Sequence, residues 1–196
     1  RRSGVRIHFA HFRTTAETAG GIAELMEEID RAKADGVDVS LDIYPYPTGS
    51  TIPVSFLPSY AQDGGPDAII RRLKDPVERR RISDYLENEL DRPLDETVFS
   101  YLPGNSHLEG MSLPDLAAER GASMGDVLCD LLLEEDLGLC MVGIGTNPQT
   151  LPAFVSHPYG MVGSDAILLG EYPSPRTYGC FPVILAAFVR AGKHLR

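Results

Sequence analysis

The 196-residue sequence lacks long apolar runs, an excess of basic residues and a cysteine framework. No stretch of about 18 or more apolar residues occurs, so we expect no membrane-spanning helix. The net charge is −10, which argues against nucleic acid as a partner because a phosphate-binding surface needs clustered Lys and Arg. The one basic cluster, Arg79–Arg81, lies among acidic residues and is interpreted as a solvated helix face.

The three cysteines, Cys129, Cys140 and Cys180, are far apart and odd in number. This is neither a disulfide framework nor the spacing of a zinc knuckle, and it predicts a reducing, cytoplasmic compartment. No Gly-x-Ser-x-Gly elbow and no Cys–His pair stand out, which disfavours serine and thiol hydrolases. The chain has no initiator methionine and no apolar signal region, so we expect a piece of a longer protein that forms one partial domain over residues 1–196.

Short β-rich runs alternate with helical patterns along the chain. Apolar spacing and stop residues predict an α/β fold whose strands pair in parallel through right-handed crossovers. A loop is expected over residues 44–51. The expected strands are 5–9, 37–43, 97–102, 139–144 and 160–164, and the expected helices are 22–35, 67–73, 77–90, 113–120, 124–135, 151–156 and 181–191.

Candidate functional residues follow the expected strands, because in parallel sheets function collects at the carboxyl ends of the strands. His11 ends the first strand and is either a metal ligand or a hydrogen-bonded core histidine. His8 lies three positions earlier, on the opposite side of a regular strand, so we expect it to pack or to face a helix. Asp42 ends the second strand and is expected to hold the following Pro-rich turn rather than face the site.

Two further candidates lie near the end of the chain. Asp165 follows the last strand and is either a metal ligand or general base, or the cap of the next turn. Arg176 lies in Pro173-Ser174-Pro175-Arg176-Thr177-Tyr178-Gly179, where a rigid loop suits a fixed fork for a carboxylate. The alternative is a surface arginine in a turn.

Taken together, four motifs resemble those of the N-acyl-D-amino-acid deacylases (D-aminoacylases) of the amidohydrolase superfamily. Residues 10–13, Ala-His-Phe-Arg, are similar to a Ser-His-x-Lys element on that family's fifth barrel strand. Residues 42–51 match almost all of its Asp-x-Tyr-Pro-Tyr-x-x-Gly-Ser-Thr stretch after the sixth strand. Ser164-Asp165 resembles a pair on its eighth strand, and residues 174–181 resemble its His-Pro-Arg-x-Tyr-Gly-x-Phe stretch.

The resemblance implies parallel β/α units that form about half of a TIM-type (β/α)8 barrel, strands five to eight. It implies zinc as the cofactor, with His11 and Asp165 as ligands. Asp165 would also move the proton of the attacking water. Arg176 would bind the substrate's α-carboxylate, with Tyr44 and Ser164 beside the substrate.

The sequence departs from the family pattern in three places. No His lies between His11 and His107, so Asp42 or a nearby Tyr takes the place of a sixth-strand metal ligand, or the site is altered. Arg13 replaces the usual lysine, and Ser174 replaces the usual histidine. The family's His-x-His pair and its early metal-bridging cysteine would lie upstream of residue 1.

The predicted reaction of the whole protein is zinc-dependent hydrolysis of an N-acyl-D-amino acid to a carboxylate and a D-amino acid. For the chain alone we expect weak or no zinc binding and no turnover, because it offers two probable ligands where zinc usually needs three or four. Open strand edges predict self-association. The alternatives are a dihydroorotase-like or hydantoinase-like amidohydrolase and a non-catalytic assembly module.

Overall fold

A computed structural model describes residues 3–15, 17–92, 94–192 and 194–195, and it divides the chain into two compact units. The first unit comprises Arg1–Pro47, Gly145–Ala166 and Pro175–Arg196. The second comprises Thr48–Ile144 and Ile167–Ser174. Arg1 and Arg2, with which the sequence opens, lie outside the described residues. Along the sequence, most of the second unit is thus one continuous stretch that interrupts the first unit.

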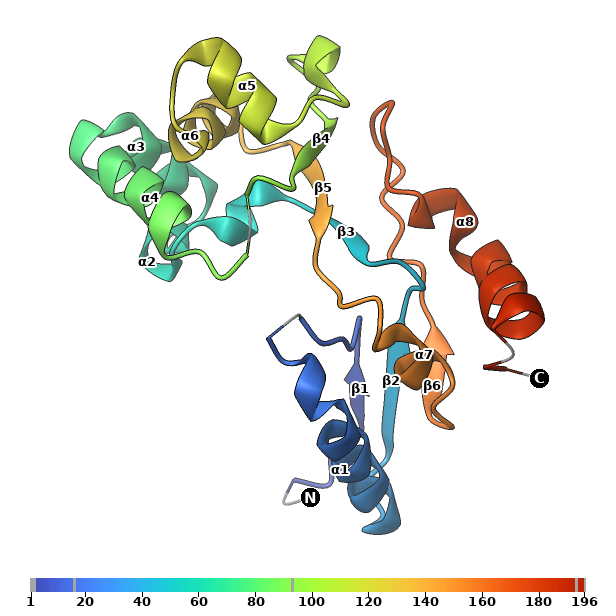
Figure 1. The fold of residues 1–196 in the computed structure, drawn as a ribbon. Coiled ribbons are helices and arrows are strands. Elements are labelled where there is room, and N and C mark those ends of the chain that lie inside the picture. Colours follow the sequence, from blue (N-terminus) through green and yellow to red (C-terminus); the bar gives the residue numbers. More distant parts are fainter. Residues whose placement is uncertain (1–2, 16, 93, 193, 196) are drawn as a thin grey trace. The chain divides into compact units, whose positions relative to one another are not determined.

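The first unit is built on a parallel sheet in the order β1-β2-β6 (Figure 1). Its strands are β1 (Ile7–Phe9), β2 (Val39–Ile43) and β6 (Gly160–Val162), with Phe9 paired to Leu41 and Leu41 to Gly160. Helix α1 (Ile22–Ala34) connects β1 to β2, as parallel pairing requires. The predicted α/β class with a parallel sheet is confirmed for this unit.

The core of the first unit covers one face of this sheet. Val39, Leu41 and Ile43 alternate along β2 and are buried, whereas Ser40 and Asp42 between them are partly exposed. The buried side chains pack with Ile29 of α1 and with Leu151, Phe154 and Val155 of α7 (Leu151–Val155). Burying such a side chain stabilises the fold by about 1.5–3 kcal/mol. The opposite face bears His8, Ser40 and Asp42 together with Met161 of β6, which pairs with Asp42 and is exposed.

Helix α8 (Arg176–Val183) begins five residues before the helix that the sequence predicted. It continues into a π-helical segment, Ile184–Ala191, so that the predicted C-terminal helix is confirmed with an earlier start. Pro182 lies within α8. Because proline has no amide hydrogen and clashes with the preceding turn, wider turns after it are a common adjustment.

The second unit contains an antiparallel sheet and helices. The sheet order is β3-β5-β4, with β3 (Thr48–Thr51), β4 (Val98–Tyr101) and β5 (Cys140–Ile144) (Figure 1). Short 3-10 turns cover Pro53–Phe56 and Ser106–Leu108. The helices are α2 (Ser59–Gln62), α3 (Pro66–Lys74), α4 (Pro76–Asn88), α5 (Leu113–Arg120) and α6 (Met124–Glu134).

Local signals fix the ends of these helices. The Asp75 carboxylate accepts hydrogen bonds from the Val77 and Glu78 amides at the start of α4. Ser112 and Ser123 do the same for α5 and α6 by accepting from the amide three residues on. Such caps contribute about 1 kcal/mol each. They explain why the predicted helix boundaries in this region agree with the structure to within about two residues.

Two sequence predictions about this region are wrong. The strands at 97–102 and 139–144 were expected in the parallel sheet, yet they form β4 and β5 and pair antiparallel with each other. Two helices, α5 and α6, separate them, and each helix reverses the chain direction, so a pair of helices returns the chain antiparallel. Residues 48–51, expected as loop, form β3 against β5.

The crossover from β2 to β6 therefore contains most of the second unit before it returns through α7. The parallel sheet has three strands among the described residues, not five. None of the helices in the described part of the chain is long and apolar enough to cross a membrane.

Candidate functional site

The candidate residues gather at the carboxyl ends of the three parallel strands, and all belong to the first unit. His11 follows β1 by two residues, Tyr44 follows β2 directly, and Asp165 follows β6 by three. Arg176 is the first residue of α8. This is the edge of an open parallel sheet at which side chains from different strands can meet one ligand.

His11 and Asp165 share an uncommon backbone conformation, with φ angles of 52° and 45°. A left-handed conformation costs a non-glycine residue about 1–2 kcal/mol, and it persists only where surrounding contacts hold it. The two turns bring the His11 Nε2 atom to 3.4 Å from Asp165 Oδ1. Both side chains remain accessible, with 36% and 35% of their surface exposed.

Arg176 holds the other oxygen of Asp165. Its Nη2 atom lies 2.6 Å from Asp165 Oδ2, and the side chain is fully buried. The guanidinium carbon lies 4.3 Å from the centre of the Tyr44 ring, a cation–π contact. The alternative of a surface arginine in a turn is therefore excluded, because this arginine begins a helix and is buried beside an aspartate.

Tyr44 connects the two arginines of the site. Its ring is buried under Arg176, and its hydroxyl accepts a 3.0 Å hydrogen bond from Arg13 Nη1. The His11 and Tyr44 ring centroids are 5.8 Å apart. Ser164, also predicted beside the substrate, is partly exposed in the segment between β6 and Asp165.

Asp42 and His8 form a second polar group at the same sheet edge. His8 Nε2 lies 2.8 Å from Asp42 Oδ2, and His8 Nδ1 lies 2.8 Å from Ser40 Oγ. Asp42 Oδ1 accepts a 2.8 Å hydrogen bond from the His11 amide. Burial raises the pKa of the Asp42 carboxyl, but the hydrogen bonds from His11 and His8 outweigh it, so the pKa lies below its usual value.

The expectation that His8 packs or faces a helix is wrong. β1 is in register with β2, so His8 lies opposite Ser40 and on the same sheet face as Asp42. Sequence reasoning missed this contact because the sequence of neither strand specifies the register between two strands that a helix connects. The alternation of buried and polar residues along β2 was the signal that could have placed Ser40 and Asp42 on one face.

His11 and Asp165 match part of a zinc site in donor type and in spacing. Two donors that share a tetrahedral zinc at about 2.05 Å lie roughly 3.3 Å apart, close to the separation seen here. The number of donors does not match, because two donors are fewer than the three or four protein ligands that zinc usually has. Among residues that the structure describes, no group of three or more His, Cys, Asp or Glu side chains could hold a metal ion.

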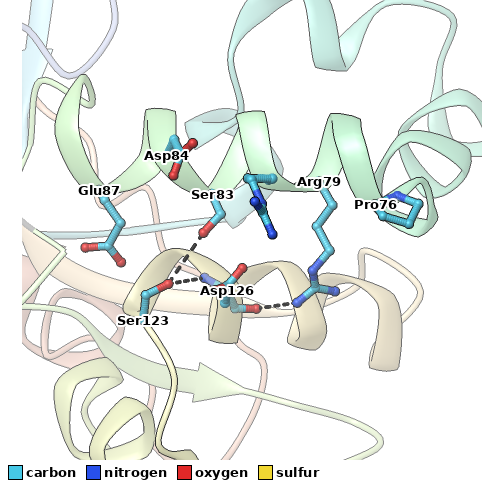
Figure 2. Close-up of a pocket in the computed structure, with 8 residues that line it drawn as sticks. Pro76, Arg79, Ser83, Asp84, Glu87, Ser123 and Asp126 are labelled. Atoms are coloured by element: carbon cyan, nitrogen blue, oxygen red, sulfur yellow. Dashed lines mark hydrogen bonds between the residues drawn. The ribbon is translucent and has the colours of Figure 1, made fainter.

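A pocket of about 580 Å³ lies in the second unit, between α4 and the start of α6 (Figure 2). Several of its polar groups form hydrogen bonds within the unit. Glu87 accepts the Gly125 amide, Ser123 accepts the Asp126 amide, and Arg79 donates to the Asp126 carbonyl oxygen. None of the candidate residues lines it. The donors at this helix start are thus used internally and do not indicate a ligand.

Comparison with known proteins agrees with the resemblance in the motifs. No family model matches the chain. An N-acyl-D-glutamate deacylase of Alcaligenes xylosoxydans xylosoxydans is 27% identical over the whole chain and 32% of its own length. A D-aminoacylase of the same organism is 29% identical over 78% of the chain and 24% of its own length. The chain is thus similar in sequence to the N-acyl-D-amino-acid deacylases.

The fold of this chain is similar to that of a solved deacylase structure. The N-acyl-D-glutamate deacylase of Bordetella bronchiseptica, complexed with zinc and a phosphonate inhibitor, superposes with a TM-score of 0.71 at 23% identity. The match covers 100% of this chain and 33% of that protein. The chain spans about a third of the length of the deacylases it matches, so the activity of a whole deacylase is a proposal for it.

Proposed function

We propose that a protein of the deacylases' length containing this chain hydrolyses N-acyl-D-amino acids to a carboxylate and a free D-amino acid. One observation carries the proposal. His11, Asp165 and Arg176, which lie far apart in the sequence, meet at one edge of the parallel sheet. The similarity to an N-acyl-D-glutamate deacylase, which covers the whole of this chain and 32% of that protein, supports the same substrate class.

Asp165 is the proposed general base and acid. Its Oδ2 is held by Arg176 at 2.6 Å, while Oδ1 faces His11 and belongs to a partly exposed side chain. A carboxylate fixed at one oxygen presents the other in a defined direction. It can accept the proton of an attacking water and return it to the nitrogen of the leaving amine.

Arg176 is the proposed anchor of the substrate's α-carboxylate, with Tyr44 beneath its guanidinium and Ser164 beside the substrate. The planar fork of an arginine suits a carboxylate, and the contact with the Tyr44 ring fixes the plane of that fork. Because Arg176 also contacts Asp165, the residue that positions the substrate and the residue that moves the proton are coupled.

His11 and Asp165 are proposed to contribute two ligands of a zinc site that other parts of a longer protein complete. When bound, zinc polarises the amide carbonyl and lowers the pKa of its water to about 7. For the isolated chain, weak or no zinc binding and no turnover stay predictions. Zinc at full stoichiometry in the isolated chain would contradict it.

The test uses the full-length protein and paired N-acetyl-D- and N-acetyl-L-amino acids with zinc supplied. We expect release of D-amino acids only, abolished by Asp165→Asn. Arg176→Lys should raise KM by about 10-fold or more because the two-pronged contact is lost. Asp91→Asn, at a side chain that is 90% exposed and outside the site, is the matched control.

The outcomes separate the alternatives. Turnover of neither series with zinc bound would point to another amide, as in dihydroorotase-like or hydantoinase-like enzymes. Absence of zinc binding by the full-length protein would favour a non-catalytic assembly module. Hydrolysis of L-substrates at the same rate would contradict the proposed stereochemistry.

Self-association also stays a prediction. β1 and β6 are the outer strands of the parallel sheet in the described part of the chain. Ile7 and Phe9 of β1 are exposed, and so is Val5 just before it. Unpaired strand edges favour pairing with another chain. Light scattering of the isolated chain should show a dimer or larger species, and a monodisperse monomer would count against the prediction.

A further inference from the structure

Asp42 makes three contacts that all bear on the turn at His11. Its carboxylate oxygen Oδ1 accepts the His11 amide at 2.8 Å. Its main-chain oxygen accepts the Phe12 amide, also at 2.8 Å. Its other carboxylate oxygen is held by His8 Nε2 at 2.8 Å. Two successive amides of one turn therefore end on a single residue of the neighbouring strand.

We propose that Asp42 is a positioning residue that sets the direction of the His11 imidazole, with His8 fixing the Asp42 carboxylate from the other side. The part of this inference that concerns catalysis rests on the proposed function of His11. Asp42 touches neither the substrate nor the reacting atoms in that scheme. It acts through the backbone of residues 11 and 12.

The conformation of His11 explains why such support is needed. A histidine with φ of 52° relaxes to the extended or right-handed region unless its amide is held. Loss of the Asp42 oxygen releases that amide, and rotation about this one residue swings the imidazole away from Asp165. Asp42, a residue of β2, thus maintains the 3.4 Å distance between His11 Nε2 and Asp165 Oδ1.

His8 and Gly163 keep the Asp42 carboxylate in place. His8 is itself anchored by Ser40 Oγ at 2.8 Å, so its ring spans the two strands at a fixed angle. A side-chain carbon at Gly163 would lie 3.1–3.3 Å from the Asp42 carboxylate, which is tight. The absence of a side chain there leaves room for the carboxylate beside the segment that leads to Asp165.

The first experiment follows the His11 amide by NMR in the 196-residue chain. Asp42→Ala should speed hydrogen exchange of that amide by about 10-fold or more and shift the imidazole resonances of His11. Asp42→Asn, which keeps a carbonyl oxygen as acceptor, should restore exchange to within about threefold of the original rate. The control is Asp38→Ala, a change of the same kind at an exposed carboxylate just before β2.

The second experiment measures steady-state kinetics in the full-length protein. Asp42→Ala should lower kcat by about 10–100-fold with KM unchanged, because Arg176 still holds the substrate. Asp42→Asn should recover most of the loss. A parallel fall in kcat and rise in KM in both variants, with equal loss of stability, would show a merely structural role and overturn the proposal.

The two experiments fail separately. An altered His11 amide in a protein that hydrolyses no N-acyl-D-amino acid would leave the positioning role standing and reject the proposed function. An unchanged His11 amide in Asp42→Ala would reject the positioning role whatever the activity. If Asp42→Ala does not fold, His8→Phe tests the proposal instead. This variant keeps Asp42 but removes the contact of His8 with its carboxylate. We then expect exchange about threefold faster, and no change would overturn the proposal.

Discussion

The two units of the chain differ in how their sheets are used. In the second unit, β4, β5 and the helices enclose one large apolar cluster that includes Phe99, Leu131 and Met141. In the first unit, the cluster covers one face of the parallel sheet, and the other face bears His8, Ser40 and Asp42. The second unit is organised for packing, whereas the first keeps a sheet face that is accessible and bears polar side chains beside the exposed Met161.

The backbone shows the same division. The strained residues of the first unit, His11 and Asp165, are the residues that converge on a common site. Those of the second unit, Asp136 and Leu137, lie in the turn after α6, with no candidate residue beside them. Backbone strain at residues whose polar side chains converge indicates a functional site. Backbone strain in a tight turn is explained by the need to connect two elements. The comparison can be tested unit by unit.

The largest expected difference is in cysteine reactivity. Burial raises the pKa of the Cys129 thiol in the second unit to about 12, against a smaller opposing influence of Arg79. At pH 8 its thiolate population is then about a thousandfold below that of an exposed cysteine, and access is blocked as well. Labelling with a thiol reagent should leave Cys129 unmodified until the chain is unfolded. Cys180 of the first unit is also buried and burial raises its pKa too, so modification of Cys129 before Cys180 would contradict the greater protection expected of Cys129.

Leu131→Ala should cost about 2–5 kcal/mol in the free energy of unfolding, because the side chain is fully buried in the core of the second unit and leaves a cavity. Leu168→Ala is the matched control, since the same atoms are removed from a side chain that is 71% exposed. Urea denaturation measures both. Equal costs would mean that the packed core of the second unit does not form.

Two glycines, one in each unit, lie so close to a neighbouring residue that an added Cβ atom would contact it. An alanine at Gly125 would place its Cβ 2.7 Å from the main-chain oxygen of Ser83, where α6 meets α4. An alanine at Gly179 would meet the hydroxyl of Tyr46, the end of a side chain that can move. We expect Gly125→Ala to cost about 1–3 kcal/mol and Gly179→Ala less.

Thermal unfolding of the two variants, with and without Tyr46→Phe, checks this order. Tyr46→Phe should relieve Gly179→Ala and leave Gly125→Ala unchanged. If Gly179→Ala is the more costly, the first unit is packed more rigidly than the open face of its sheet suggests.

The smallest expected effect is at a surface ion pair of the second unit. Arg120 donates to both oxygens of Glu134 at 3.0 and 3.2 Å, on a partly exposed surface. Arg120→Ala should cost about 0.2–1 kcal/mol, less at high salt because the charges are screened. A loss above about 2 kcal/mol that is independent of salt would assign this pair to the core of the unit.

Local signals predicted the helices well and the pairing of strands poorly. Helix α5 agrees residue for residue with its prediction, because Ser112 and Gly121 mark its two ends. Strands β4 and β5 were recognised as strands but assigned to the wrong sheet. Composition and periodicity specify a strand, but the choice of its neighbour depends on how many helices intervene and on what they pack against.

The candidate site shows the same limit in finer detail. His11, Tyr44, Asp165 and Arg176 were named from their positions after strands and from resemblance, and the structure brings them together. The contact of His8 with Asp42 was missed, because it depends on strand register and on the end of β1 at Phe9. The expectation that Asp42 holds the Pro-rich turn after β2 was wrong, because its carboxylate accepts the amide of His11 in the turn after β1.

The sequence by itself determined the α/β class, the positions of most helices, and the candidate residues that follow the parallel strands. These depend on spacing, capping and side-chain chemistry, which act over a few residues. Only the tertiary structure decided which strands are parallel, that Arg176 is buried against Asp165, and that Asp42 supports His11. Those features join residues separated by eleven to more than a hundred positions along the chain, and packing and register alone bring them together.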